Sequence, residues 1–207
     1  MISPRVAVEA MRLGLGTCWI GPGADQTSVA RHLGDRFDPA KDHIICVCAI
    51  GYKSWYLPTI VRLMNRQFHR RLPLSALFFA APCFPQPLSV AAAPFNQFGR
   101  AYEGCQWSPS SYNGQTTRCA GIALPSVEPD ARRRCRFDFY AATASRYYAA
   151  VALGIWCANW EMGCEALGIT GRLDVLAAEA RDAAPATGPH LPRYDMSCVQ
   201  TAVHSLI

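Results

Sequence analysis

Between two apolar regions lies the stretch Trp107-Ser108-Pro109-Ser110-Ser111-Tyr112-Asn113-Gly114-Gln115-Thr116-Thr117-Arg118. Proline fixes its own φ, and serine and asparagine side chains bond to neighbouring backbone groups. The stretch therefore predicts a tight turn that presents amides and side-chain oxygens outward. We interpret it as a binding loop for a flat ligand with polar edges, and the alternative is an ordinary surface turn that leads into a helix.

Regular elements are predicted on both sides of this loop. A helix is expected over 95–106, two strands that form a hairpin over 119–124 and 136–140, and a mostly buried helix over 147–167, where apolar residues recur at near-helical spacing. We expect the final segment, 199–207, to be a loosely attached arm.

The first part of the chain has its own series of elements. Apolar spacing predicts a helix over 1–13, which the glycine-rich segment 14–23 must end. A short helix over 28–33 and a buried strand over 42–52 follow. The next predicted helix, 55–71, has one apolar and one basic side.

These elements predict an α+β protein in which helices pack around a small mixed or antiparallel sheet. The stretch 81–94 contains four prolines and is expected to be a linker between residues 1–80 and 95–184, with a tail over 185–207. The ending Ala166-Leu167-Gly168-Ile169 echoes Arg12-Leu13-Gly14-Leu15. This short echo favours two pseudo-repeated halves.

Composition excludes several classes of function. The net charge of +5 rests on scattered basic residues, so nucleic-acid binding is not expected. The ten cysteines show no Cys-x-x-Cys spacing, so we expect free thiols, no metal site and a cytoplasmic protein. No apolar run approaches the roughly 20 residues of a membrane-spanning helix, and no membrane association is expected.

Basic residues gather at the end of the predicted helix 55–71, at Arg66, His69, Arg70 and Arg71. Such a cluster can hold a phosphate through charge-assisted hydrogen bonds. The alternative is a solvated helix end, because cations are favoured there by the helix dipole in any case.

Two motifs together resemble the nitroreductase family of flavoproteins. The loop Pro109-Ser110-Ser111-Tyr112-Asn113-Gly114-Gln115 is similar to the family's Pro-Ser-x-x-Asn-x-Gln loop, and the segment from Leu13 to Gly21 resembles its Gly-Leu-Gly turn. The order of the two motifs resembles the subgroup in which two half-domains are fused in tandem. The likeness implies a nitroreductase-like fold.

The resemblance also implies a site for FMN. One wall would comprise Pro109, Ser110, Ser111, Asn113 and Gln115, and the opposite wall Trp19 with the backbone N–H groups of Ile20 and Gly21 near the flavin N5 and O4. Arg71, helped by Arg70 or His69, would hold the phosphate. Tyr112 and Trp19 would flank the ring, although aromatic residues beside such turns more often serve packing.

The implied activity is electron transfer from NADH or NADPH, through FMN, to a nitroaromatic or quinone acceptor. The flavin carries this chemistry, so no catalytic acid or base is expected. The protein would be a monomer that imitates the family's dimer, or a homodimer.

Two departures from the family pattern leave an alternative open. Gln115-Thr116-Thr117 stands where the family has Gln-Pro-Trp, and the family's Arg-x-Ser-x-Arg motif, which holds the FMN phosphate, is absent. We therefore expect the first half to lack its opening part. A degenerate, flavin-free binding or scaffold module is the alternative function.

Overall fold

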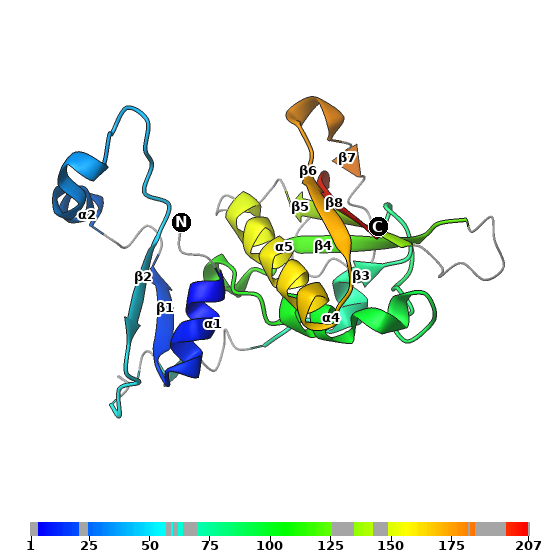
Figure 1. The fold of residues 1–207 in the computed structure, drawn as a ribbon, viewed down its shortest axis with the longest axis horizontal. Coiled ribbons are helices and arrows are strands. Elements are labelled where there is room, and N and C mark those ends of the chain that lie inside the picture. The colour runs from blue at the N-terminus through cyan, green and yellow to red at the C-terminus, as the bar shows by residue number, and fades with distance from the viewer. Residues whose placement is uncertain are drawn as a thin grey trace. The chain divides into compact units, whose positions relative to one another are not determined.

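The computed structural model describes residues 4–20, 25–56, 59, 62–63, 70–125, 135–142, 149–181, 183–184 and 198–206. The protein is mixed helix and sheet, as expected for an α+β fold (Figure 1). Its contacts divide it into two units, residues 1–63 and 64–207. The predicted helix 55–71 and residues 185–197 of the predicted tail lie largely or wholly outside the described residues.

The second unit is built on a mixed sheet with the strand order β3-β4-β5-β8-β6, to which β7 is added beside β8. Its strands are β3 (Phe78–Phe79), β4 (Thr117–Ala123), β5 (Cys135–Ala142), β6 (Gly171–Val175), β7 (Ala183–Ala184) and β8 (Cys198–Leu206). Strands β3 and β4 are parallel, and every other pair is antiparallel. The predicted hairpin is confirmed, because β4 pairs with β5 with Cys119 opposite Phe139.

The expectation of a loose arm over 199–207 was wrong. Residues 199–206 lie in β8, which is a central strand between β5 and β6. Ala202 and His204 in this strand are both buried. The strand's partners lie far away in the sequence, so pairing with them could not be foreseen from local composition.

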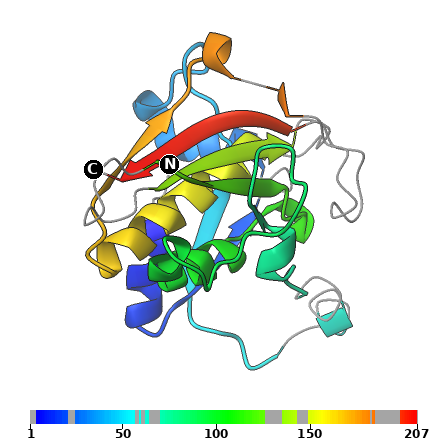
Figure 2. The same ribbon diagram turned by 90° about the vertical axis from the view of Figure 1, so that its right-hand side faces the viewer.

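Two helices lie against one face of this sheet (Figure 2). Helix α4 (Gly99–Gln106) follows a 3-10 turn at Phe95–Phe98, and α5 (Ala149–Ala166) contributes Trp156 and Trp160 to the core. The predicted helices 95–106 and 147–167 are thus confirmed. Gly163 allows α4 to approach closely, because a Cβ there would lie 2.4 Å from the Cα of Ala101.

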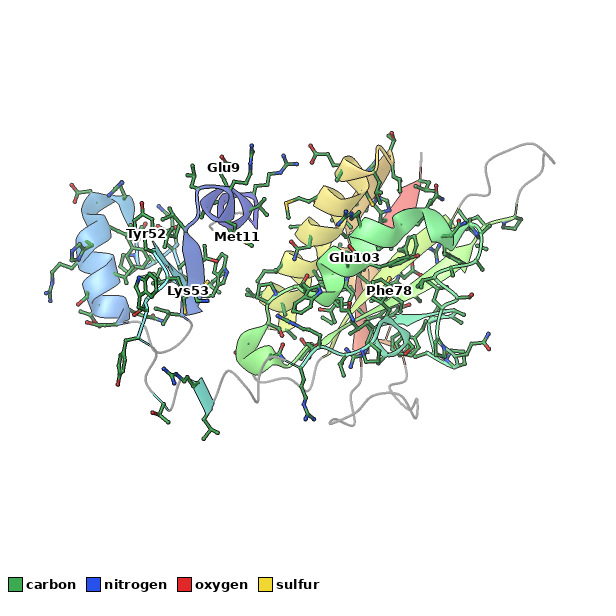
Figure 3. The ribbon with its side chains drawn as sticks, turned by 90° about the horizontal axis from the view of Figure 1, so that it is seen from below. Glu9, Met11, Tyr52, Lys53, Phe78 and Glu103 are labelled. Atoms are coloured by element: carbon green, nitrogen blue, oxygen red, sulfur yellow. The ribbon has the colours of Figure 1, made fainter. Side chains whose placement is uncertain are left out.

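Aromatic side chains fill the space between sheet and helices. The ring of Trp160 lies 4.4 Å from that of Phe137 and 5.3 Å from that of Phe98, measured between centroids. Phe78 is also fully buried, whereas Glu103 on α4 is exposed (Figure 3). Burial of each such ring contributes about 1.5–3 kcal/mol, so this cluster is the main stabilising core.

The proline-rich stretch 81–94 belongs to the second unit. Phe84 and Leu88 within it are buried, and the N–H of Leu88 donates to the carbonyl of Phe78 at 2.9 Å. The division by contacts falls between residues 63 and 64 and not in this stretch. Short 3-10 turns at Leu74–Ala76, Ser111–Asn113 and Ala178–Ala180 complete the described elements of the unit.

The elements bounded within the described residues of the first unit are α1 (Pro4–Arg12), β1 (Gly16–Ile20), α2 (Gln26–Leu33) with a 3-10 turn at Gly34–Arg36, and β2 (Val47–Gly51). The glycine-rich segment ends α1 as predicted, with Gly14 at a φ of 73°. It also contains a strand that sequence reasoning missed. β1 pairs with β2 in antiparallel register, with Cys18 opposite Ala49.

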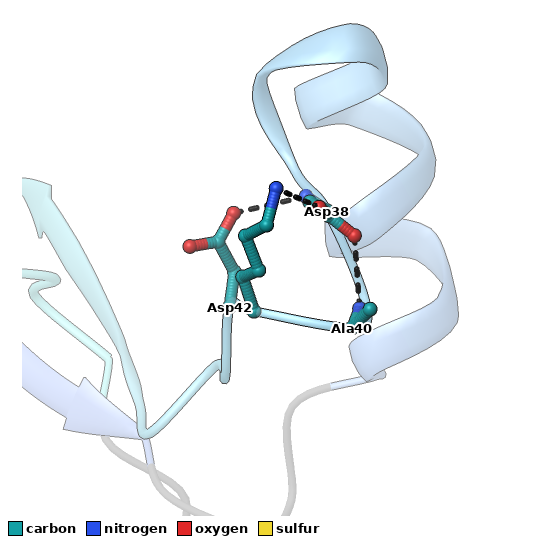
Figure 4. Close-up of polar contacts among 4 residues, drawn as sticks. Asp38, Ala40 and Asp42 are labelled. Atoms are coloured by element: carbon teal, nitrogen blue, oxygen red, sulfur yellow. Dashed lines mark hydrogen bonds and ion pairs between the residues drawn. The ribbon is translucent and has the colours of Figure 1, made fainter.

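The predicted buried strand 42–52 is shorter in the structure and begins at Val47, and its residues are half-buried or exposed. Asp42 lies instead in a turn, where its carboxylate accepts from the N–H of Asp38 at 2.9 Å (Figure 4). The carboxylate of Asp38 accepts from the N–H of Ala40 and pairs with Lys41. These side-chain bonds compete with strand pairing and explain the later start.

In the part of the chain that the structure describes, no helix combines the length and apolar character needed to cross a bilayer.

Candidate functional site

The loop singled out from the sequence lies against the chain segment 70–72 of the same unit. The side-chain oxygen of Gln115 accepts from the N–H of Leu72 at 2.8 Å, and its amide nitrogen donates to the carbonyl of Arg70 at 3.0 Å. The amide nitrogen of Asn113 donates to the same carbonyl at 2.9 Å. Two side-chain amides thus act on the segment as a neighbouring strand would.

The backbone of the loop takes an unusual path to present these amides. Asn113 has a φ of 51° and Gln115 a φ of 47°, which is the left-handed region that side chains other than asparagine rarely adopt. The hydroxyl oxygen of Ser110 accepts from the N–H of Gln115 at 2.9 Å and stabilises the turn. Strained backbone of this kind gathers at functional sites, although it also occurs in structural turns.

Arg71 is held at the centre of this arrangement. Its Nη1 donates to the carbonyl of Ser108 at 3.0 Å and to Oδ1 of Asn113 at 2.9 Å, and its guanidinium lies 5.5 Å from the centroid of the Trp107 ring. Partial burial lowers the pKa of Arg71. No carboxylate among the described residues pairs with it. A half-buried cation whose protein partners are neutral is suited to bind an anion.

Hydrogen bonds from helices α4 and α5 fix the loop and the segment 70–72. The hydroxyl of Ser108 donates to the carbonyl of Gly104 at 3.1 Å and accepts from the amide of Asn159 at 2.7 Å. The amide of Gln106 donates to the carbonyl of Leu72 at 2.9 Å. Loop and segment 70–72 are therefore both fixed to the helical layer.

The structure brings together seven of the ten residues predicted for the site. Pro109, Ser110, Ser111, Asn113 and Gln115 share the loop, and Arg70 and Arg71 lie on the segment that it holds. Trp19 and Ile20 lie on β1 of the first unit. Gly21, predicted for the same wall, is outside the described residues.

The sequence did not predict which groups the side-chain amides of Asn113 and Gln115 would bind. We expected Asn113 and Gln115 to face a ligand, and in this structure each binds the backbone or Arg71 of its own chain. The partners are 42 to 45 residues away in the sequence. The amide nitrogen of Gln115 also donates to the carbonyl of Asn113 at 3.5 Å. One hydrogen of the Asn113 amide and the outer edge of Arg71 are therefore what the site offers beyond these bonds.

Four further residues of the site were missed. Trp107 and Ser108 lie at the beginning of the loop sequence 107–118, and their roles depend on contacts that the sequence does not show. Gln106 ends α4. Asn159 is a single amide in a strongly apolar helix, and that isolation was the one signal that could have drawn attention to it.

The first unit has a separate pocket of about 240 Å³. Trp19, Leu33, Ile44 and Cys46 are among its lining residues, together with His43. The pocket is mostly apolar and lies between α2, β1 and the segment before β2. Among the described residues, Trp19 is the one predicted site residue on its wall.

The thiols have a structural role. The nine cysteines whose side chains the structure describes are free, and five of them are buried. Burial raises the pKa of Cys135 to about 11 and that of Cys157 and Cys164 to about 12, so these thiols stay protonated and unreactive. Among the described residues, no three His, Cys, Asp or Glu side chains gather closely enough to hold a metal ion.

Comparison of the chain with models of protein families, with characterised proteins and with solved structures found no match. The function is therefore inferred from the residues of this chain.

Proposed function

We propose that the chain binds FMN at the loop 108–115 and acts as an FMN-dependent oxidoreductase of the nitroreductase type. The observation that supports this proposal is the half-buried guanidinium of Arg71, which has no carboxylate partner in the described part of the chain. A flavin phosphate would supply the missing negative charge. Arg70, which is exposed beside it, would add a second cation.

The residues present fit a phosphate better than they fit the flavin ring. Within the described part of the chain, Arg71 keeps its Nη2 group for a ligand, because its two hydrogen bonds both use Nη1. On the loop, the hydroxyls of Ser110 and Ser111 and the remaining hydrogen of the Asn113 amide could contact the ribityl chain or the ring edge. The opposite wall expected at Trp19, Ile20 and Gly21 stays a prediction.

When bound, FMN would take a hydride from NADH or NADPH and pass electrons to a nitroaromatic or quinone acceptor. The chain's own residues would anchor the phosphate through Arg71 and orient the cofactor through the fixed loop. No acid or base of the chain is needed for this reaction. The free, protonated thiols agree with our proposal of a cytoplasmic protein.

A titration with FMN tests this assignment. Arg71→Gln removes the cation, and we expect it to weaken FMN binding about 10- to 100-fold, since hydrogen bonds to charged groups contribute about 1.5–3 kcal/mol. Arg100→Gln is the matched control, because Arg100 is exposed and forms an ion pair with Glu103 on the same helix. Circular dichroism would verify that both variants fold. Equal affinity in the wild type and both variants would reject Arg71 as the anchor.

A flavin-free binding or scaffold module is the second candidate. It is favoured by the closed set of bonds between Asn113, Gln115 and segment 70–72, which gives both amides a structural use without a ligand. In that case FMN would not bind to the wild type. The same titration therefore separates the two candidates.

A further inference from the structure

A small cavity is lined in part by residues of the loop. Its volume is about 10 Å³, and its walls come from the loop, the end of α4 and the middle of α5. Ser110, Thr116 and Trp156 are among the lining residues. A cavity of this size holds roughly one water molecule and nothing larger.

Two polar atoms on residues of this wall have no hydrogen-bond partner among the described groups: Oγ1 of Thr116 and Nε1 of Trp156. The two side chains are almost completely buried, with exposed fractions of 6% and 3%. Buried polar groups nearly always have a partner, in the protein or in an ordered water. Each of these atoms belongs to a different element, one to the loop and one to α5.

We propose that one water molecule is bound in this cavity and joins the loop to α5. It accepts from Nε1 of Trp156 and donates to Oγ1 of Thr116. The hydroxyl of Ser110, whose oxygen accepts from the N–H of Gln115, can donate to it as a third partner. Two to four such partners are what a buried water requires.

This water has a defined role beside the direct bond from Asn159 to Ser108. That bond fixes the beginning of the loop to α5, and the water fixes its end, next to β4. The loop is then held to the helix at two places. The inference does not depend on FMN, since it concerns the buried side of the loop.

Replacing the hydroxyl of Thr116 by a methyl group tests the proposal, because the sign of the change in stability depends on whether the water is present. If the water bridges the two groups, Thr116→Val should raise the unfolding equilibrium constant about five- to thirtyfold, because the buried water loses a partner. Thr116→Ser is the control, because it keeps the hydroxyl and removes only the methyl group. If the hydroxyl has no partner, Thr116→Val should leave stability unchanged or increase it, which would overturn the proposal.

Combining this change with Trp156→Phe tests whether one water serves both groups. The effects of the two substitutions on urea unfolding should be non-additive, with the double variant less destabilised than the two changes predict together. Additive effects would contradict a shared water. A high-resolution crystal structure of the wild type should show density within about 3.2 Å of both atoms, and an empty cavity would overturn the proposal.

Discussion

Asn113 combines a strained backbone with two hydrogen bonds that no other residue type would reproduce. Its φ of 51° is tolerated by asparagine and glycine, and its amide binds Arg71 on one side and the carbonyl of Arg70 on the other. The sequence predicted a special role for this residue from its place in the loop. It did not predict that the role includes fixing a distant segment of the same chain.

At Asn113, unlike at an ordinary position, replacement by alanine should therefore give no more stable a protein than replacement by glycine. We expect Asn113→Ala and Asn113→Gly to lower the free energy of unfolding by about 1–3 kcal/mol through the lost bonds. Alanine should be no better than glycine, because it is strained at positive φ. At the exposed control Asn96, alanine should be the better replacement. Urea unfolding measures both pairs, and a clear advantage of alanine at position 113 would refute the strain.

His204 is a buried titratable residue on the central strand β8. Its ring faces Trp160 at 5.8 Å between centroids, and burial lowers its pKa. The folded protein therefore holds the neutral imidazole, whereas the unfolded chain takes up a proton near its ordinary pKa of about 6.5. Stability should be complete above that pH and should decrease as the pH falls below it.

The expected result is a free energy of unfolding that is lower at pH 5 than at pH 7. His204→Gln cannot titrate and should show a smaller difference between the two pH values. Chemical denaturation at both pH values measures the effect. An unchanged pH dependence in His204→Gln would show that this residue is not its source.

At the scale of elements, the contact between α4 and α5 depends on one glycine. Gly163 faces the backbone of Ala101 so closely that a Cβ would lie 2.4 Å from its Cα, whereas Gly154 on the same helix has open space around it. Gly163→Ala should force the helices apart and cost about 1–3 kcal/mol. Gly154→Ala should instead stabilise by about 0.5–1 kcal/mol, because alanine favours helix. Thermal unfolding of both variants checks the contrast, and similar shifts would contradict the close approach.

The elements that the sequence predicted are those with strong local patterns. Helices α1 and α5 show apolar residues at helical or near-helical spacing, and the strands of the β4–β5 hairpin are two short apolar runs separated in the sequence by a cluster of arginines. Strand β1 was hidden because its residues follow two glycines, and β8 because its partners β5 and β6 lie far away in the chain. Tertiary pairing, not local propensity, decides both strands.

At the scale of the whole molecule, the chain forms two units of different construction. The second unit has a six-stranded sheet with an aromatic core. The first unit has a two-stranded sheet, and among its described residues only Ala10, on α1, is buried. The candidate site residues are divided between them, seven in the second unit and two described residues in the first. The sequence predicted that the loop and the arginines would come together, but the bonds that join them depend on side chains more than 30 residues apart.

The central claim, that the loop and Arg71 serve an FMN site, is tested most directly by the visible absorption spectrum of the purified full chain. The protein would be incubated with excess FMN and then separated from free flavin. We predict the absorption bands of flavin at one FMN per site, and their loss in Arg71→Gln but not in Arg100→Gln. A folded wild-type protein that remains colourless after this treatment would contradict the claim.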